Sequence, residues 1–284
     1  MLASVQEVAA VVTQPDKPAG RGLKLTDSPV KIKASELGIP VYQPQSLKDF
    51  EPDFKNIDPQ LSVVVAYGKI IPEFILGHRK GAVNTHASLL PKYRGAAPIQ
   101  RAIMNDEPET GITIQKMVPE LDAGDIISTK KVTIDKEDTT GSLRNKLSVI
   151  AADLLVETVD GLDGLKGVRQ DESLVTWAPK VSKEETVIKW EEPHTKIFNL
   201  IRAMNPAPGA QATLNGQSIK IWSSSLNETP GKPGQVIELS KKSFVIGCGV
   251  GSLSLEIVQV SGKNKVKGFE YARNSGIKEG DALI

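Results

Sequence analysis

Short apolar runs alternate with stretches of helical periodicity through the first half of the chain. The run 61–67, Leu-Ser-Val-Val-Val-Ala-Tyr, is typical of a strand covered on both faces. Ser28 followed by Pro29 predicts a helix start, and Gly38 predicts its end. The other expected elements are strands at 8–13, 39–41, 82–85, 111–117 and 126–134, and helices at 97–104 and 140–162. This alternation predicts an α/β fold with a mainly parallel sheet, which binds ligands at the carboxyl ends of its strands.

The pattern changes after about residue 165. One helix is expected at 193–204, ended by a run of Pro and Gly. Short β-type segments separated by Gly and Asn follow at 212–214, 219–223, 235–238, 244–247 and 253–260. These segments predict a small antiparallel barrel or sandwich. The three tryptophans of the chain are expected to be packing residues: Trp177, Trp190 and Trp222.

Composition narrows the class of protein. The 284 residues suggest two domains, and 39% hydrophobic residues suffice for a core. The net charge of +1 means that any nucleic acid must be bound by a local basic patch. No apolar run approaches the ~20 residues that span a bilayer, and the start lacks a signal-peptide pattern. The single Cys248 excludes an intramolecular disulfide, and the three His are too scattered for a local zinc motif. We therefore expect no metal and a cytoplasmic, reducing compartment, or an organellar matrix if a targeting segment precedes this sequence.

Candidate chemistry gathers where the predicted strand 82–85 ends. Asn84 and His86 are two residues apart, so on an extended chain their side chains point to the same side. An amide beside an imidazole can stabilise a developing oxyanion. A carboxylate could orient the imidazole, and the sequence offers Asp122 or Asp125 for this role without choosing between them. Taken singly, His86 and either Asp are better explained as a structural residue and a turn former.

Several motifs together resemble those of folate-dependent formyltransferases. The stretch 84–98, Asn-Thr-His-Ala-Ser-Leu-Leu-Pro-Lys-Tyr-Arg-Gly-Ala-Ala-Pro, is similar to that family's signature. The segments Thr-Gly-Ile-Thr at 110–113 and Leu-Asp-Ala-Gly-Asp at 121–125 follow in the family's order. Four further segments resemble the members that act on initiator tRNA: 13–22, 65–70, 180–185 and 202–206. The likeness covers nearly the whole chain and implies a Rossmann-like formyltransferase domain followed by a small OB-like β-barrel.

The resemblance implies transfer of a formyl group from 10-formyltetrahydrofolate to the amino group of initiator methionyl-tRNA. Asn84 and His86 would stabilise the tetrahedral oxyanion, and Asp122 would set the charge of the imidazole and help to move protons. Because the formyl group arrives activated by the folate, neither a metal nor a covalent enzyme intermediate is needed. The residues that match the family's folate-binding positions are Ser88, Leu89, Leu90 and Pro91, with Tyr67, Gly68 and Ile70 from a second turn.

The resemblance also assigns tRNA contacts to two basic segments. In the loop 14–27, Arg21 matches the principal basic residue, and Lys17 and Lys24 would bind phosphates. Without the resemblance this loop would be interpreted as a solvated surface loop. Near the end of the chain, Lys263, Lys265 and Lys267 alternate along an expected strand edge. They could contact tRNA or protect that edge from aggregation, and the sequence does not decide between the two. We expect a monomer.

The sequence departs from the family's pattern at its start. Residues 1–4 match the end of the family's first helix, so the first central strand is expected to be missing from this sequence. The expected divisions are a catalytic domain at 1–178, a linker with a connecting helix at 179–206 and a barrel at 207–284. One alternative is a catalytically impaired tRNA-binding fragment. Others are formyltransferases acting on glycinamide ribonucleotide, which lack the carboxyl domain, or on an amino sugar nucleotide, which typically carry Arg where Ala96 stands here.

Overall fold

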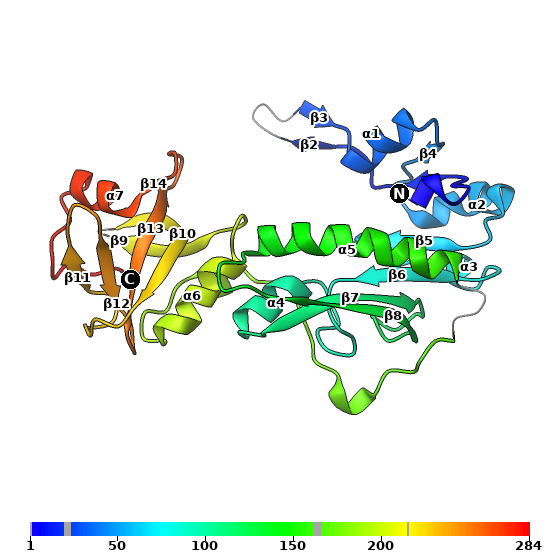
Figure 1. The fold of residues 1–284 in the computed structure, drawn as a ribbon. Coiled ribbons are helices and arrows are strands. Elements are labelled where there is room, and N and C mark those ends of the chain that lie inside the picture. The colour runs from blue at the N-terminus through cyan, green and yellow to red at the C-terminus, as the bar shows by residue number, and fades with distance from the viewer. Residues whose placement is uncertain (1, 20–23, 162–165, 215) are drawn as a thin grey trace. The chain divides into compact units, whose positions relative to one another are not determined.

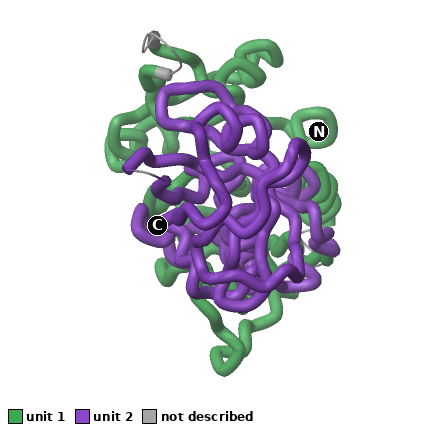
Figure 2. The backbone as a smooth tube through the Cα atoms, turned by 90° about the vertical axis from the view of Figure 1, so that its left-hand side faces the viewer, with its two compact units in different colours: residues 1–94, 111–131, 148–177 green, residues 95–110, 132–147, 178–284 purple. Residues whose placement is uncertain are grey.

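The computed structural model describes residues 2–19, 24–161, 166–214 and 216–284. The chain divides into two compact units, each assembled from separate stretches of sequence (Figure 2). The first comprises residues 1–94, 111–131 and 148–177, and the second comprises 95–110, 132–147 and 178–284. In the described ranges, no helix is both long enough and apolar enough to cross a lipid bilayer.

The first unit contains three sheets in its described residues, two of them two-stranded (Figure 1). Strand β1 (Val11–Val12) pairs in parallel with β4 (Val41–Tyr42). A separate four-stranded sheet has the order β5-β6-β7-β8 and contains β5 (Ser62–Val65), β6 (Ala82–His86), β7 (Glu109–Lys116) and β8 (Ile126–Thr133). β5 and β6 are parallel, whereas β6 and β7 are antiparallel. The α/β class and the strand positions are therefore confirmed, and the parallel pairs bring the carboxyl ends of β5 and β6 to the same edge.

The helices around these strands begin and end for local chemical reasons. Helix α1 (Pro29–Glu36) starts after Ser28, whose hydroxyl accepts a hydrogen bond from the Lys31 backbone, and Gly38 follows it with φ +67°. The long helix α5 spans Thr140–Asp160. The aromatic side chains of Phe50 and Phe54 pack with Ile75 and Ala82 in a small apolar core. The first unit also contains short helices: η1 (Leu2–Ser4), η2 (Leu47–Phe50), α2 (Glu51–Ile57), α3 (Glu73–Leu76) and η4 (Glu172–Leu174).

The predicted loop 14–27 contains more order than expected. Its arms form an antiparallel hairpin of β2 (Lys17–Ala19) and β3 (Lys24–Thr26). An ion pair between Lys31 Nζ and Asp16 Oδ2, 2.5 Å apart, fixes the base of the hairpin. Gln43 donates to the other carboxylate oxygen of Asp16 over 2.8 Å. An alternating pattern is not recognisable here, because the two arms are only three residues long.

The second unit contains the antiparallel sheet expected after residue 207. Its strand order is β11-β12-β13-β10-β9, with β14 paired to β13. The strands are β9 (Ala210–Leu214), β10 (Gln217–Asn227), β11 (Val236–Leu239), β12 (Phe244–Gly247), β13 (Ser252–Val260) and β14 (Val266–Lys267). The helical elements are α4 (Pro98–Met104), η5 (Glu184–Thr186), α6 (His194–Ala203) and α7 (Gly268–Asn274).

Two expectations about particular residues were wrong. Lys263 lies in a turn and Lys265 in irregular chain, so only Lys267 of the three is on a strand, and they do not line one strand edge. Between the turn that follows β13 and helix α7, only Val266 and Lys267 pair as a strand. Trp190 is buried as expected, but Trp177 is 60% exposed and therefore does not pack in a core.

Helix α6 packs one face into the interior of the second unit. Its buried face carries Ile197 and Ile201, which are four residues apart and therefore lie on the same side of the helix. The Arg202 guanidinium at its last turn donates to the carbonyls of Asp135 and Asp138. Arg101 of α4 pairs with Glu185, and this cation is the main reason that the pKa of Glu185 falls to about 2. The Arg202 contacts join α6 to the segment 135–138, and the Arg101–Glu185 pair joins α4 to the segment before α6.

We expect Ile201→Ala to lower the free energy of unfolding by about 2–5 kcal/mol, because it removes a buried side chain and leaves a cavity. Urea unfolding measures this difference. Lys196→Ala on the exposed face of the same helix is the control and should change stability by less than about 0.5 kcal/mol. Equal stability of the two variants would contradict the packing described for α6.

Candidate active site

Four polar side chains lie on one face of the β6–β7 pair. Asn84 and His86 are alternate residues of β6, and their cross-strand partners on β7 are Gln115 and Thr113. Side chains of directly paired residues stand on the same face of a sheet. The sequence had predicted the shared orientation of Asn84 and His86, and the pairing with β7 adds an amide and a hydroxyl beside them.

Each ring nitrogen of His86 has a polar group nearby. Nε2 lies 2.8 Å from the backbone carbonyl oxygen of Tyr93. A carbonyl oxygen only accepts, so Nε2 carries a proton and donates. Nδ1 faces Asp122, with 3.6 Å between it and Oδ2. That separation is too long for a direct hydrogen bond but short enough for strong electrostatic interaction. Both side chains are largely buried, with 6% of His86 and 11% of Asp122 exposed.

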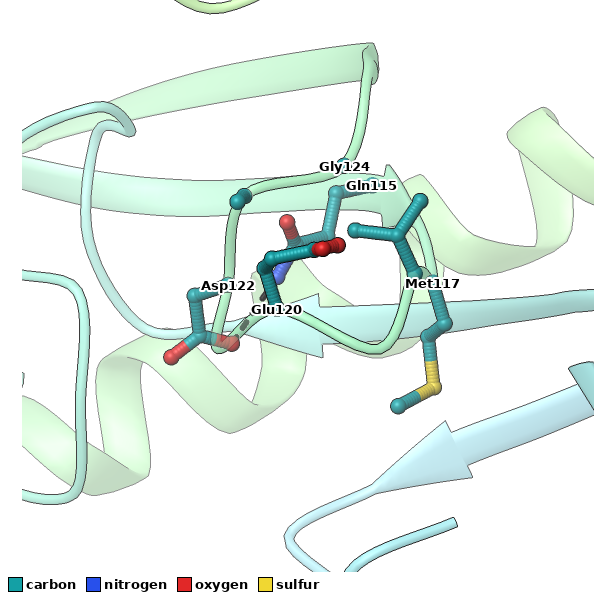
Figure 3. Close-up of a pocket in the computed structure, with 7 residues that line it drawn as sticks. Gln115, Met117, Glu120, Asp122 and Gly124 are labelled. Carbon is teal, nitrogen blue, oxygen red and sulfur yellow. Dashed lines mark hydrogen bonds between the residues drawn. The ribbon is translucent and has the colours of Figure 1, made fainter. Parts of the chain in front are cut away.

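Asp122 lies on the tight loop between β7 and β8. Its other carboxylate oxygen, Oδ1, accepts a hydrogen bond of 2.9 Å from Gln115 Nε2, as Figure 3 shows. Gly124 packs so closely on β7 that an added Cβ would lie 1.7 Å from the Lys116 carbonyl oxygen. The residues around a small hollow beside this loop are Gln115, Met117, Val118, Glu120, Asp122, Ala123 and Gly124. The alternative carboxylate, Asp125, is exposed, and its backbone carbonyl accepts from Lys116. The structure therefore brings Asp122, and not Asp125, to His86.

The segment after β6 is folded back by Thr113. The Thr113 hydroxyl donates to the Ser88 carbonyl over 2.7 Å and accepts from the Leu90 backbone N–H over 3.2 Å. The buried Ser88 hydroxyl donates to the Lys92 carbonyl, and the Leu90–Pro91 peptide is cis. Leu89 lies against Gly111 of β7. Four expected folate-binding residues, Ser88 to Pro91, thus form one rigid turn directly beyond His86.

A second turn leaves the neighbouring strand β5. Gly68 has φ +74°, and the Tyr67 carbonyl accepts a 2.7 Å hydrogen bond from Gln14 Nε2. The Tyr67 hydroxyl is buried and has no hydrogen-bond partner, and burial raises its pKa. A buried hydroxyl without a partner is costly and marks a place where a bound group could satisfy it. Ile70, in contrast, is 92% exposed.

The expected tRNA-binding residues belong to the two units separately. Arg21 lies outside the described residues. Lys17 is on β2, and its ammonium donates to Gln14 over 3.1 Å, while Lys24 begins β3. In the second unit, Lys265 Nζ lies 3.7 Å from the ring centroid of Trp222. Lys267 Nζ lies 5.9 Å from the ring of Phe269. Both geometries are within the range of cation–π contacts.

Three side chains that hold the candidate site were missed in the sequence: Thr113, Gln115 and Gln170. In the sequence, Thr113 stands out only as part of a motif. Gln170 binds the backbone carbonyls of Asp122 and Gly124, and no sequence pattern connects it to residues nearly fifty positions earlier. Gln115 could have been proposed from its place on an alternating strand, but its partner on β6 was needed to give it a role. In the described ranges, no group of three or more His, Cys, Asp or Glu side chains is placed to hold a metal ion.

Solved structures share this fold. HypX from Aquifex aeolicus in complex with tetrahydrofolic acid superposes with a TM-score of 0.65, covering 87% of this chain and 45% of that chain, at 21% identity. WlaRD, a sugar 3N-formyl transferase studied in the presence of dTDP and 5-N-formyl-THF, gives a TM-score of 0.63 at 21% identity and covers 90% of this chain and 88% of its own. At such low identities these likenesses establish the fold alone.

Curated relatives are much more similar in sequence. Methionyl-tRNA formyltransferase of Moorella thermoacetica is 44% identical over 290 residues, covering 100% of this chain and 93% of the relative. The enzyme of the same name from Bacillus velezensis is 42% identical, covering 98% of this chain and 90% of the relative. Residues 3–159 match the family model described as formyl transferase, and residues 180–276 match that of the formyl transferase carboxyl-terminal domain. Both the matched domains and the identity over the whole chain show that this protein belongs to the formyl transferase family.

Proposed function

We propose that the chain transfers a formyl group from 10-formyltetrahydrofolate to the α-amino group of methionyl-tRNA. The observation that carries this proposal is the grouping of Asn84 and His86 on one face of β6 with Asp122, whose Oδ2 lies 3.6 Å from His86 Nδ1. The identity of up to 44% with methionyl-tRNA formyltransferases over the whole chain selects the acceptor.

The chemistry follows from the hydrogen-bonding capacity of the three groups. The free amine attacks the formyl carbon, and the carbonyl oxygen becomes an oxyanion. The Asn84 amide and the imidazolium of His86 stabilise that oxygen. The collapse of the intermediate breaks the bond from the formyl carbon to N10 of the folate, and the proton lost by the amine is transferred to N10. Asp122 Oδ2, 3.6 Å from His86 Nδ1, is near enough to take part in proton movement during the transfer.

The folate is assigned to the two turns that follow β5 and β6. Ser88, Leu89, Leu90 and Pro91 present a turn fixed by Thr113. The turn with Tyr67, Gly68 and Ile70 supplies the buried Tyr67 hydroxyl, which a polar ring substituent could satisfy. The exposed side chain of Ile70 offers apolar area at the same edge. No metal takes part in this proposal.

Methionyl-tRNA is assigned to basic residues in both units. Lys17 begins β2 and Lys24 begins β3 of the hairpin, and Arg21 falls between them in the sequence. In the second unit, Lys263, Lys265 and Lys267 occupy the stretch between β13 and α7. Lys and Arg side chains neutralise phosphates and give affinity without reading sequence. The protein is proposed to act as a cytoplasmic monomer.

An amino sugar nucleotide is the second acceptor to be tested, because solved sugar N-formyltransferases share the fold. Ala96 at the position where those enzymes typically carry Arg weighs against it. A formyl-transfer assay with methionyl-tRNA and with a dTDP-amino sugar, run with the same folate, decides between the two. Turnover only with methionyl-tRNA is the expected result, and turnover only with the sugar nucleotide would overturn the proposal.

For His86→Ala we expect kcat to fall by about 10²–10³, because one oxyanion-stabilising donor is lost. Binding of methionyl-tRNA should change little, since the ring is buried in the candidate site. Steady-state kinetics and filter binding measure the two effects. His78→Ala is the matched control, because His78 pairs with Asp58 away from β6. A variant at His86 that turns over like the wild type would refute the assigned role.

For Lys265→Gln we expect weaker methionyl-tRNA binding at every tRNA sequence and a salt dependence that is shallower by about one unit of slope. The KM for folate should stay unchanged. Lys242→Gln, in the turn between β11 and β12, removes the same charge elsewhere and serves as the control. Arg21→Ala should raise the KM for tRNA in the same selective way. A changed folate requirement with normal tRNA kinetics would argue against both assignments.

A further inference from the structure

Residues 170–176 contact the loop that carries Asp122 and, separately, Tyr93, whose carbonyl binds His86. Gln170 Nε2 donates to the backbone carbonyl oxygens of Asp122 and Gly124 over 2.8 and 2.7 Å. At the other end, the Thr176 hydroxyl accepts a 2.9 Å hydrogen bond from the Tyr93 N–H. The Tyr93 carbonyl is the group that holds His86 Nε2. One short segment thus braces the loops on either side of the pair.

The orientation of the Gln170 amide is dictated by Arg94. Nε and Nη2 of Arg94 donate to Gln170 Oε1 over 3.0 and 2.9 Å. A guanidinium has only donors, so the amide oxygen must face Arg94 and the NH₂ group must face the two carbonyls. Both side chains are buried, with 4% of Gln170 and 3% of Arg94 exposed. The charge of Arg94 is balanced at the surface by Glu172, whose Oε1 lies 2.8 Å from Nη2.

The loop that Gln170 contacts needs such a constraint. Asp122 has φ +51°, a left-handed backbone conformation that costs free energy in a residue with a Cβ. The two carbonyls bound by Gln170 belong to the 122–123 and 124–125 peptides, so a single NH₂ group holds two peptides of the turn. At the side-chain end, Gln115 Nε2 donates to Asp122 Oδ1 over 2.9 Å. Loss of the Gln170 hydrogen bonds would leave the position of Oδ2 relative to His86 free to shift.

We propose that Gln170, oriented by Arg94, is a positioning residue for formyl transfer, which clamps the 122–124 turn so that the Asp122 carboxylate faces His86. The inference rests on the proposed function, because it gives the clamp a reaction to serve. Neither Gln170 nor Arg94 is proposed to contact the substrates. Gln170 acts through Asp122, and Arg94 acts through Gln170.

The test uses the isosteric variant Gln170→Met in the full chain. We expect kcat to fall by about 10- to 100-fold, because a small misplacement of a catalytic group has an effect of that size. The KM values for 10-formyltetrahydrofolate and methionyl-tRNA should stay within about twofold, since the clamp touches neither site directly. Arg94→Met should lower kcat in the same manner. In the double variant the two losses should not multiply, because residues that act as a unit are not additive.

Gln211→Met is the matched control for loss of a glutamine hydrogen bond. Its amide donates to the Thr186 hydroxyl over 2.9 Å in the second unit. We expect a lower thermal midpoint and an unchanged kcat per folded molecule. If Gln170→Met does not fold, Arg94→Lys replaces it, because it keeps the charge but loses the two-donor contact with Oε1. A fall in kcat at constant KM supports the clamp in that variant also.

The outcomes separate this inference from the function on which it rests. A wild-type chain that forms no formylmethionyl-tRNA refutes the proposed function. An active wild type with Gln170→Met or folded Arg94→Lys at full kcat overturns the clamp alone. The clamp is also overturned if the loss in kcat equals the loss of folded protein, or if the two single effects multiply in the double variant.

Discussion

The antiparallel pairing of β6 with β7 is the constraint on which the candidate site depends. It places Gln115 opposite Asn84 and Thr113 opposite His86. Gln115 then fixes the Asp122 carboxylate, and Thr113 fixes the turn from Ser88 to Leu90. A slip of β7 by one residue against β6 would turn Gln115 and Thr113 to the face opposite Asn84 and His86. The relative positions of these four side chains therefore follow from the pairing of the two strands.

A second layer of contacts holds this arrangement in place. The buried pair of Arg94 and Gln170 ties the Asp122 turn to the segment that supports His86. Burial makes these hydrogen bonds both strong and necessary, because an unpaired polar group in this environment is costly. These hydrogen bonds of Arg94, Gln170 and Thr176 therefore bear on the relative position of the His86 imidazole and the Asp122 carboxylate.

The sequence predicted most elements because apolar runs such as 61–67 and caps such as Ser28 act locally. It also predicted that Asn84 and His86 face one way, since that follows from strand geometry alone. It did not choose Asp122 over Asp125, because that choice depends on how the 117–125 loop folds against β7. Gln170 could not be found, since its role comes from contacts distant in the sequence. The lysines at 263–267 were misplaced because alternation also occurs in chain that turns into a helix.

The central claim is that the Asp122 carboxylate, beside His86, is required for the chemical step of the proposed transfer. The most direct test is the single-turnover rate of formyl transfer by Asp122→Asn, with both substrates bound to saturation. The variant keeps the shape of the side chain and removes its charge. We expect the single-turnover rate to fall by about 100-fold or more at unchanged substrate affinities. A single-turnover rate equal to that of the wild type would contradict the account.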